Sequence, residues 1–408
     1  MAERNWAGNV TFRAARLHHP RTLDEVCDLV AGAPRVRALG TRHSFNDIAD
    51  TGGDLIALDA LDGLIDIDTE RRLVRVPAGI RYGDLAVQLD SAGWALANLA
   101  SLPHISVIGA VATATHGSGD ANPTLSAAVA AVEIVDGTGT TRTVERGEAD
   151  FDGMVVGVGL LGVVTRLSLD IIPTFSLRQD IYRGLAWERL LGDFDTITSA
   201  GYSVSINPDW GGDSSNVRVK SIATETVEDL HGAQRATADL PFAEGATDRS
   251  GVPGAWLDRL PHFRLGHTPS FGEELQSEYL MAREHAPAAL EAVRSAVGAD
   301  LTPAILHGTE IRTVARDALW LSGAYETDTV GLHFTWKLEP EAVHALLPRI
   351  EEALAPFAPR PHWGKLFRMP AEEIRPLFPK MPDFLDLRER FDPDRRFVNE
   401  WAERVFGL

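Results

Sequence analysis

The first 170 residues alternate short apolar segments with glycine-rich turns. Residues 23–31 carry apolar side chains at helical spacing between a capping box and a glycine, which predicts an amphipathic helix. Residues 82–91 repeat this pattern and predict a second helix. Segments rich in β-branched and apolar residues predict short strands at residues 36–39, 55–58, 65–67 and 73–76. Many short strands with few helices favour an α+β fold over a regular βαβ repeat.

The pattern changes after residue 173. The later segments are longer and richer in tryptophan, with helical stretches expected within residues 274–297 and a helix at residues 340–354. The last forty residues are helical, charged and interrupted by prolines. A chain of 408 residues exceeds one ordinary core. We therefore expect one domain at residues 1–173, a second at 174–365, and a C-terminal segment, 366–408, that returns to the first.

Composition narrows the possible partners. With 44% hydrophobic and 24% charged residues the chain reads as soluble and globular, and no apolar run approaches the ~20 residues that span a bilayer. The net charge of −19 argues against nucleic acid or an anionic membrane as partner. It also disfavours a strongly anionic substrate, although a local Arg or Lys can override the net field. No basic-then-apolar signal segment is present, so a cytoplasmic protein is expected.

The sequence contains neither the cysteines of a disulfide framework nor a metal-binding motif. The single cysteine, Cys27, excludes an intramolecular disulfide framework. No HExxH motif or paired carboxylate–histidine spacing occurs, so no metal site is expected.

Residues 157–162 match the GxGxxG dinucleotide fingerprint. The fingerprint functions when its last glycine opens a helix whose amides meet a pyrophosphate. Here residues 163–169 alternate apolar and polar side chains, which predicts a strand instead. A nicotinamide-type Rossmann site is therefore disfavoured.

Two small-residue segments are better candidates for a ligand wall. The loop GTRHSFN, residues 40–46, follows a predicted strand, and consecutive amides in such a turn can bind an anion. His43 in this loop could equally be a hydrogen-bonded surface residue. Residues 101–119 carry no charge, which suits close passage of a large flat ligand or, alternatively, a buried strand with Ser/Thr turns.

Two predicted strands of the second half present polar side chains on one face. Residues two apart share a strand face, which pairs Glu310 with Arg312, and His333 with Thr335. Such a face is commonly just solvated, yet its mixture of donors and acceptors suits a polyhydroxylated neutral ligand. Further on, residues 362–365 place His362 and Trp363 beside Lys365, which could also be an exposed lysine.

In this order, the segments GTRHSFN, ASLPHISVIGAVATATHGSG, TEIRTV, HFTW and RPHWGK resemble those of the alditol oxidases, a family of vanillyl-alcohol-oxidase-type flavoproteins. The resemblance runs from residues 5–9 to residues 391–399. It implies a two-domain α+β fold, with an FAD-binding domain built from the N-terminal part plus the C-terminal tail and a central sheet-based substrate domain. The first two segments are shared with sugar-lactone oxidases, and the last three narrow the substrate.

The resemblance implies FAD bound covalently through His43 to the 8α-methyl of the isoalloxazine. Residues 41–42, Thr and Arg, depart from a smaller pair in some relatives, which leaves the path of this loop open. The residues that the resemblance places around the cofactor are Gly40, Thr41, Arg42, His43, Ser44, Ser101, Ser106, Gly109, Thr113, His116, Gly117, Val163, Val164 and His362.

The resemblance also assigns a polyol site and a reaction. A terminal primary alcohol is oxidised to the aldehyde while O₂ becomes hydrogen peroxide, and a larger side chain at Ala100 would hinder access of oxygen. Arg312 and Lys365 would stabilise developing alkoxide character, with His333 or Lys365 as candidate acceptor of the alcohol proton. The implied alditol-binding and catalytic residues are Ser101, Glu310, Arg312, His333, Thr335 and Lys365.

Two alternatives stay open. A flavin-dependent sugar-lactone oxidase would share the fold and cofactor, and a non-catalytic polyol-binding protein would share the pocket alone. In each case the expected partners are small molecules, and the chain is expected to act as a monomer.

Overall fold

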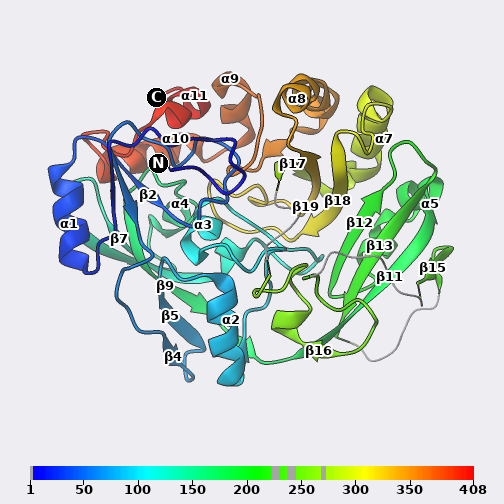
Figure 1. Ribbon diagram of the computed structural model, residues 1–408, viewed down its shortest axis with the longest axis horizontal. Coiled ribbons are helices and arrows are strands. Elements are labelled where there is room, and N and C mark those ends of the chain that lie inside the picture. The colour runs from blue at the N-terminus through cyan, green and yellow to red at the C-terminus, as the bar shows by residue number, and fades with distance from the viewer. Residues whose placement is uncertain (1–2, 223–228, 237–244, 268–272) are drawn as a thin grey trace.

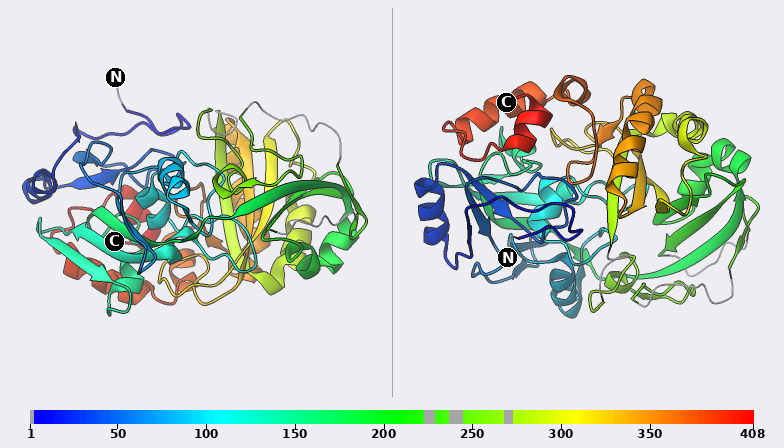
Figure 2. Two further views of the ribbon diagram at one scale, coloured as in Figure 1. Left: turned by 90° about the horizontal axis from the view of Figure 1, so that it is seen from below. Right: turned by 45° about the horizontal axis from the view of Figure 1, so that its top comes forward.

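The computed structural model describes residues 3–222, 229–236, 245–267 and 273–408 (Figure 1). Its strands form a three-stranded parallel sheet, a two-stranded sheet, a five-stranded antiparallel sheet and a ten-stranded sheet. The small sheets and the C-terminal helices make up one half of the molecule, and the ten-stranded sheet makes up the other (Figures 1 and 2).

The N-terminal half contains the predicted short strands. The parallel sheet has the order β1-β3-β2 and the antiparallel sheet the order β4-β5-β9-β7-β8, while β6 pairs with β10. Their bounds are β1 Arg16–His18, β2 Val36–Leu39, β3 Asp54–Ala57, β4 Asp66–Asp68, β5 Leu73–Pro77, β6 Trp94–Ala95, β7 Val129–Val135, β8 Thr141–Glu145, β9 Val163–Asp170 and β10 Ile172–Pro173. The helices of this half are α1 Leu23–Gly32, α2 Tyr82–Ser91, α3 Val107–Ala112 and α4 Phe151–Met154.

The ten-stranded sheet has the order β14-β15-β11-β13-β12-β18-β19-β17-β20, and β16 also pairs with β11. Helices α7 and α8 lie along one side of it (Figure 1). Its strands are β11 Ser176–Ala186, β12 Ser203–Pro208, β13 Ser214–Ser221, β14 Asp229–Leu230, β15 Ala233–Arg235, β16 Gly254–Ala255, β17 Glu274–Ala282, β18 Leu306–Val314, β19 Thr329–Lys337 and β20 Arg360–Pro361. The associated helices are α5 Trp187–Gly192, α6 Phe194–Thr198, α7 Ala286–Val297 and α8 Pro340–Leu354.

The period-two pattern of β19 sorts its side chains between two environments. Leu332, Phe334 and Trp336 are fully buried, and Phe334 stacks on Trp336 with ring centroids 5.1 Å apart. The alternate residues His333 and Thr335 therefore face the other side of the sheet, as the sequence predicts. Within residues 274–297, helix α7 confirms the expected helical stretch, but residues 274–282 form strand β17. Glu274, Gln276 and Glu278 share one face of this segment, and Leu275, Ser277 and Tyr279 share the other, which is a strand pattern.

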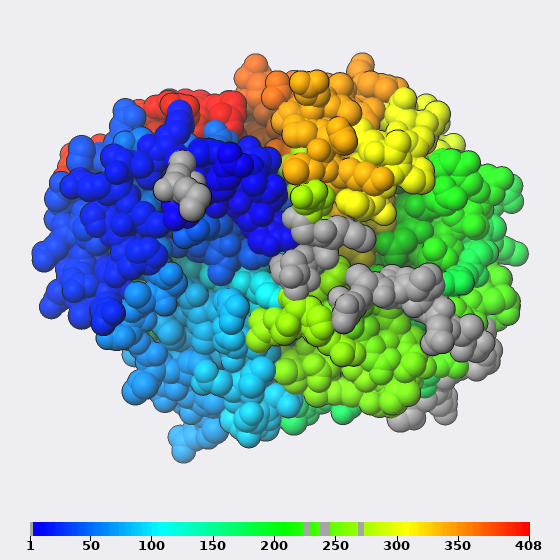
Figure 3. Space-filling model, viewed as in Figure 1, coloured from blue at the N-terminus to red at the C-terminus, as the bar shows by residue number. Residues whose placement is uncertain are grey.

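The C-terminal segment returns to the N-terminal half, as expected from the sequence. Helices α9 Ala371–Ile374, α10 Met381–Phe391 and α11 Glu400–Phe406 lie beside the early strands (Figure 2). Asn399 caps α11 through Ala402 N, and its Nδ2 donates to the carbonyl of Asp50 at 2.7 Å. The space-filling view shows the C-terminal residues continuous with the surface of the early residues (Figure 3).

Arg37 on β2 joins the tail to the early sheets from inside the core. Its buried guanidinium donates to the carbonyls of Gly159 at 2.7 Å, Val158 at 3.0 Å and Phe397 at 3.0 Å, and also to the carbonyl of Ile48. A buried cation needs acceptors for its donors, and here backbone carbonyls accept from both terminal nitrogens, while Nε has no partner within the described ranges.

No helix in the described ranges is long and apolar enough to cross a membrane.

Replacement of Arg37 by methionine should destabilise the protein by about 3 kcal/mol or more. The substitution leaves four buried carbonyls without their donor. Thermal unfolding should show a midpoint lowered by at least about 4 °C. The exposed neighbour Arg35 provides the matched control, because Arg35→Met removes the same charge without uncovering a buried acceptor. Equal midpoints for the two variants would contradict this role of Arg37.

Candidate active site between the two halves

A cavity of about 630 Å³ extends between the two halves of the molecule. One end is lined by the glycine turn after α4, the middle by the loop after β2 and the 100–116 segment, and the other end by the ten-stranded sheet. The described residues around it include most of those that the sequence singles out.

The glycine turn at residues 157–162 precedes strand β9, so the expected absence of a helix is confirmed. Gly159 and Gly162 have positive φ values of 72° and 152°. A Cβ on Gly162 would lie 2.3 Å from the carbonyl oxygen of Val135, which requires glycine there. The turn forms one wall of the cavity and lacks Rossmann geometry.

His43 lies in the loop after β2, and both of its ring nitrogens are buried without a hydrogen-bond partner among the residues that the structure describes. The ring stacks on that of Trp6 with centroids 5.4 Å apart. Burial, followed by the nearby His104, lowers the pKa of His43 to about 4. The imidazole is therefore neutral near pH 7, and the alternative of a hydrogen-bonded surface residue is wrong. Arg42 belongs to the pair of residues in this loop that is smaller in some relatives. It has φ 65° and forms an ion pair with Glu3.

The loop after β2 approaches the 100–116 segment closely enough to need small residues. A Cβ on Gly40 would meet Ser106 Oγ at 2.5 Å, and one on Gly109 would meet it at 2.8 Å. Ser106 Oγ itself is buried and has no hydrogen-bond partner in the described part of the chain. The predicted alternative of a buried strand is wrong here, since residues 107–112 form helix α3. This narrow, small-residue wall fits a flat ring system lying against backbone.

The same loop is tied to the segment that carries Lys365. Asn46 Nδ2 donates to the carbonyls of Trp363 and Lys365, both at 2.8 Å, and Phe45 N donates to Gly364 O at 2.8 Å. His362 N in turn donates to the carbonyl of Glu278 on β17. The loop of His43 and the sheet are thereby held at a defined separation.

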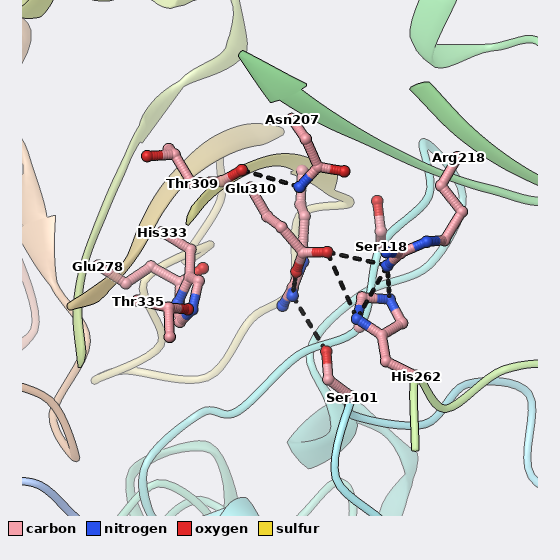
Figure 4. A network of polar contacts seen from close by, with 12 residues as sticks. Ser101, Ser118, Asn207, Arg218, His262, Glu278, Thr309, Glu310, His333 and Thr335 are labelled. Atoms are coloured by element: carbon pink, nitrogen blue, oxygen red, sulfur yellow. Dashed lines mark hydrogen bonds and ion pairs between the residues drawn. The ribbon is translucent and has the colours of Figure 1, made fainter. Parts of the chain in front are cut away.

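The predicted polar face of β18 and β19 is one continuous surface. The strands pair antiparallel with Glu310 opposite His333 and Arg312 opposite Gly331. Glu310 accepts from Arg312 and, at 2.9 Å, from Arg218 Nη1, and Arg312 Nη2 donates to Ser101 Oγ at 3.0 Å (Figure 4). These contacts bring Ser101 of the N-terminal half onto the sheet.

Beside this network, Lys365 and Glu278 form an ion pair in the interior. Lys365 Nζ also donates to His333 Nδ1 at 2.7 Å, and His333 Nε2 lies 2.9 Å from Thr335 Oγ1. Because an ammonium only donates, Nδ1 is the acceptor and the ring proton is inferred to lie on Nε2. Burial, followed by the charge of Lys365, lowers the pKa of His333 to about 3.

Glu278 is a site residue that the sequence reasoning missed. Burial alone raises its pKa, but Lys365 and His116 more than offset this and hold the pKa of Glu278 well below its usual range. His116 Nε2 lies 3.2 Å from Glu278 Oε1. The feature of the sequence that could have identified Glu278 was the period-two pattern of β17. Arg218 and His262 were also missed, and they carry no local motif.

Two residues predicted near the cofactor do not line the cavity. Val163 is fully buried in a cluster with α1, because alternation along β9 directs Val164 into the cavity and Val163 to the opposite face. Gly117 packs against Asn98, where a Cβ would lie 2.4 Å from Oδ1. The predicted residues that do line it are Gly40, Thr41, Arg42, His43, Ser44, Ala100, Ser101, Ser106, Gly109, Thr113, His116, Val164, Glu310, Arg312, His333, Thr335, His362 and Lys365.

Among the described residues, no group of three or more His, Cys, Asp or Glu side chains is arranged to hold a metal ion. The residues present do fit a flavin. His43 offers two buried nitrogens without a partner in the described ranges, and the Gly40–Ser106–Gly109 contact leaves a cradle that added Cβ atoms would fill.

Comparison with known proteins agrees with this geometry. A family model described as FAD binding domain matches residues 14–145, and one described as D-arabinono-1,4-lactone oxidase matches residues 272–405. An alditol oxidase from Streptomyces sp. is 46% identical over 97% of this chain and 96% of its own. An L-gulono-1,4-lactone dehydrogenase from Mycobacterium tuberculosis is 30% identical over 99% of this chain and 98% of its own.

Among solved structures, a cholesterol oxidase from Brevibacterium sterolicum superposes with a TM-score of 0.80 at 14% identity, covering 99% of this chain and 96% of its own. At that identity the likeness shows the fold alone. The family models and the relatives identify the class as FAD-dependent oxidoreductases of the vanillyl-alcohol-oxidase type. Within that class, the chain belongs to the alditol oxidase family.

The low pKa values of His43 and His333 predict a loss of stability in acid. The unfolded chain takes up these protons below about pH 6.5, whereas the native protein does so only near pH 4 and pH 3. Stability should therefore fall by up to about 1.4 kcal/mol per pH unit and per histidine between pH 6.5 and pH 4. Thermal unfolding of the apoprotein at several pH values measures this. The apoprotein of His43→Asn should lose less over the same interval, and an identical loss would contradict the assignment.

Proposed function

We propose that this protein oxidises a terminal primary alcohol of an alditol to the aldose and reduces O₂ to hydrogen peroxide. Xylitol, sorbitol and glycerol are the candidate substrates. The observation that carries the proposal is the shared polar face of β18 and β19, closed by Ser101 and Lys365. This surface offers both donors and acceptors, as neutral hydroxyl groups require. The similarity to an alditol oxidase over almost the whole chain supports the same reaction.

FAD would lie between the loop after β2, the 100–116 segment and the glycine turn, with a covalent bond to His43. When bound, FAD supplies the acceptor for the hydride and the route of electrons to O₂. A neutral imidazole can act as the attacking nitrogen in such a linkage, and the lowered pKa of His43 supports this. Ala100, buried beside Ser101, is proposed to leave oxygen room to enter.

The substrate site is proposed to hold the reacting carbon near Lys365, His333 and Thr335. Thr335 Oγ1 accepts the proton of His333 Nε2, which leaves the threonine hydroxyl free to donate to a substrate oxygen. Lys365 and Arg312 stabilise developing negative charge on that oxygen. Glu310 accepts hydrogen bonds from hydroxyls further along the chain. Glu278, His333 and Arg312 are all buried, so solvent screens their electrostatic interactions only weakly.

That the protein acts as a cytoplasmic monomer on a polyol and O₂, without nucleic acid or membrane partners, stays a prediction from the sequence.

His43→Ala should abolish the acid-stable attachment of flavin. After acid precipitation, the flavin of the natural protein should stay with the pellet, whereas that of the variant should appear in the supernatant or be absent altogether. The absorbance of both fractions gives the readout. His19→Ala removes a half-exposed surface histidine and serves as control. Acid-stable flavin in the His43 variant would reject the linkage.

Glu310→Gln or Arg312→Ala should lower kcat/KM for xylitol and sorbitol at least ~30-fold, about 2 kcal/mol of transition-state binding. Glu310→Gln leaves the buried guanidinium groups of Arg218 and Arg312 without their shared carboxylate, and Arg312→Ala leaves Glu310 paired with Arg218 alone and Ser101 without its donor. The assay is peroxide formation on xylitol, sorbitol and glycerol. Glu341→Gln, on the exposed side of α8, provides the control.

The same assay includes an aldonolactone, because a family model named for a lactone oxidase matches residues 272–405. Turnover of the lactone without turnover of any alditol would replace the proposed reaction by lactone oxidation.

A further inference from the structure

The cavity continues past Glu310 to a group of basic side chains that the proposed reaction does not use. Arg218, Arg249 and His262 line this part of the cavity, and we call it the basic end. Figure 4 shows Arg218 and His262 on one side of Glu310, and His333, Thr335 and Glu278 on the other. The basic end therefore lies away from the proposed position of the reacting carbon.

Strand register explains this separation. Ser205 on β12 pairs with both Arg218 on β13 and Arg312 on β18, so these three residues form a row across neighbouring strands. His333 lies one strand further, on β19, opposite Glu310. Since neighbouring strands are about 4.8 Å apart, three spacings separate β13 from β19, and a linear substrate can lie across the strands between them.

Carboxylates are scarce in this part of the cavity. Among the described residues that line it, the carboxylates are Glu278 and Glu310. Glu278 is paired with Lys365, and Glu310 is shared between Arg218 and Arg312. Two guanidinium groups therefore compete for one carboxylate in the protein interior.

Further basic groups lie close to this pair. The same Nη1 of Arg218 that donates to Glu310 also lies 2.8 Å from His262 Nε2, so a histidine and not a second carboxylate lies beside this nitrogen. Lys220, next on the same face of β13, donates to the carbonyl of Leu260. Burial, together with Arg218, Arg312 and Arg249, lowers the pKa of Lys220 well below its usual range.

The guanidinium of Arg218 is also incompletely satisfied. The residue is only 8% exposed, and its buried Nε has no hydrogen-bond partner within the described ranges. Burial lowers the pKa of Arg218 to about 10, so it stays charged near neutral pH. Buried like charges with an unused donor are costly, and an anion bound among them offsets that cost.

We propose that the preferred substrate is a polyol with an anionic far end, a carboxylate or a phosphate, that binds at the basic end. Its primary alcohol lies by Lys365, His333 and Thr335 at the opposite end. This inference rests on the proposed function and adds the charge of the substrate. The reaction is R–CH₂OH + O₂ → R–CHO + H₂O₂, in which the carbon loses a hydride, the hydroxyl loses its proton, and the anionic group is unchanged.

This local arrangement opposes the field of the whole protein. The net charge of −19 disfavours an anionic substrate at long range. Within a buried site, however, a charge-assisted hydrogen bond to a guanidinium outweighs a screened distant field.

The test compares kcat/KM for sorbitol, sorbitol 6-phosphate and gluconate by peroxide formation with the flavin-loaded enzyme. At least one anionic polyol should exceed sorbitol tenfold or more, and the better of the two identifies a phosphate or a carboxylate as the bound group. Inorganic phosphate or acetate should then inhibit in competition with that substrate. These measurements need no variant and decide the question even if substitutions at Arg218 fail to fold.

Arg218→Gln should lower the ratio of kcat/KM for the anionic polyol to kcat/KM for sorbitol at least tenfold, and Arg218→Lys should restore part of it. Arg349→Gln, which removes one positive charge from the exposed side of α8, should leave the ratio unchanged. An equal loss on both substrates would show that Arg218 acts only through Glu310, and this would overturn the anion site.

The outcomes separate the two proposals. Efficient turnover of sorbitol with neither anion preferred overturns this inference and leaves the proposed function standing. Turnover of an anionic polyol without turnover of xylitol or sorbitol supports the inference and replaces the neutral substrates of the proposed function. Peroxide from none of these substrates overturns both.

Discussion

The guanidinium of Arg37 is buried where three distant parts of the chain meet. It donates to the carbonyl of Ile48 in the segment after β2, to two carbonyls of the glycine turn before β9, and to the carbonyl of Phe397 in the tail. A planar cation with five donors cannot be buried unless acceptors surround it, so the three segments must converge on it together. That convergence forms the wall of the cavity and explains why the C-terminal segment belongs to the N-terminal half.

The ten-stranded sheet forms the opposite wall of the cavity, where the register between strands fixes the positions of the side chains. Antiparallel register places Glu278, His333 and Glu310 on three neighbouring strands with their side chains on one face. Large apolar side chains on the other face are fully buried, which prevents a slip by one residue, because a slip would exchange the two faces. The charged groups of the site are therefore held by the hydrophobic packing behind them.

Connections between the two walls set their separation. Asn46 holds the segment of Lys365 against the loop of His43, and His262 N donates to the carbonyl of Ser101. Each contact joins residues more than 150 positions apart in the chain. Two buried cations make the ends of the cavity electrostatically different. Lys365 is paired with Glu278, whereas Arg218 shares Glu310 with Arg312.

Local pattern was enough for the sequence to determine strands β2 to β5, β9, β18 and β19, the helices at 23–31, 82–91 and 340–354, the loop of His43, and the polar face of β18 and β19, because each depends on neighbours within a few residues. Only the tertiary structure decided that Glu278, Arg218 and His262 join this face, and that Val163 and Gly117 turn away from the cavity. The reason is physical: register between strands and the convergence of loops depend on packing between residues far apart in the chain, and no local motif records it.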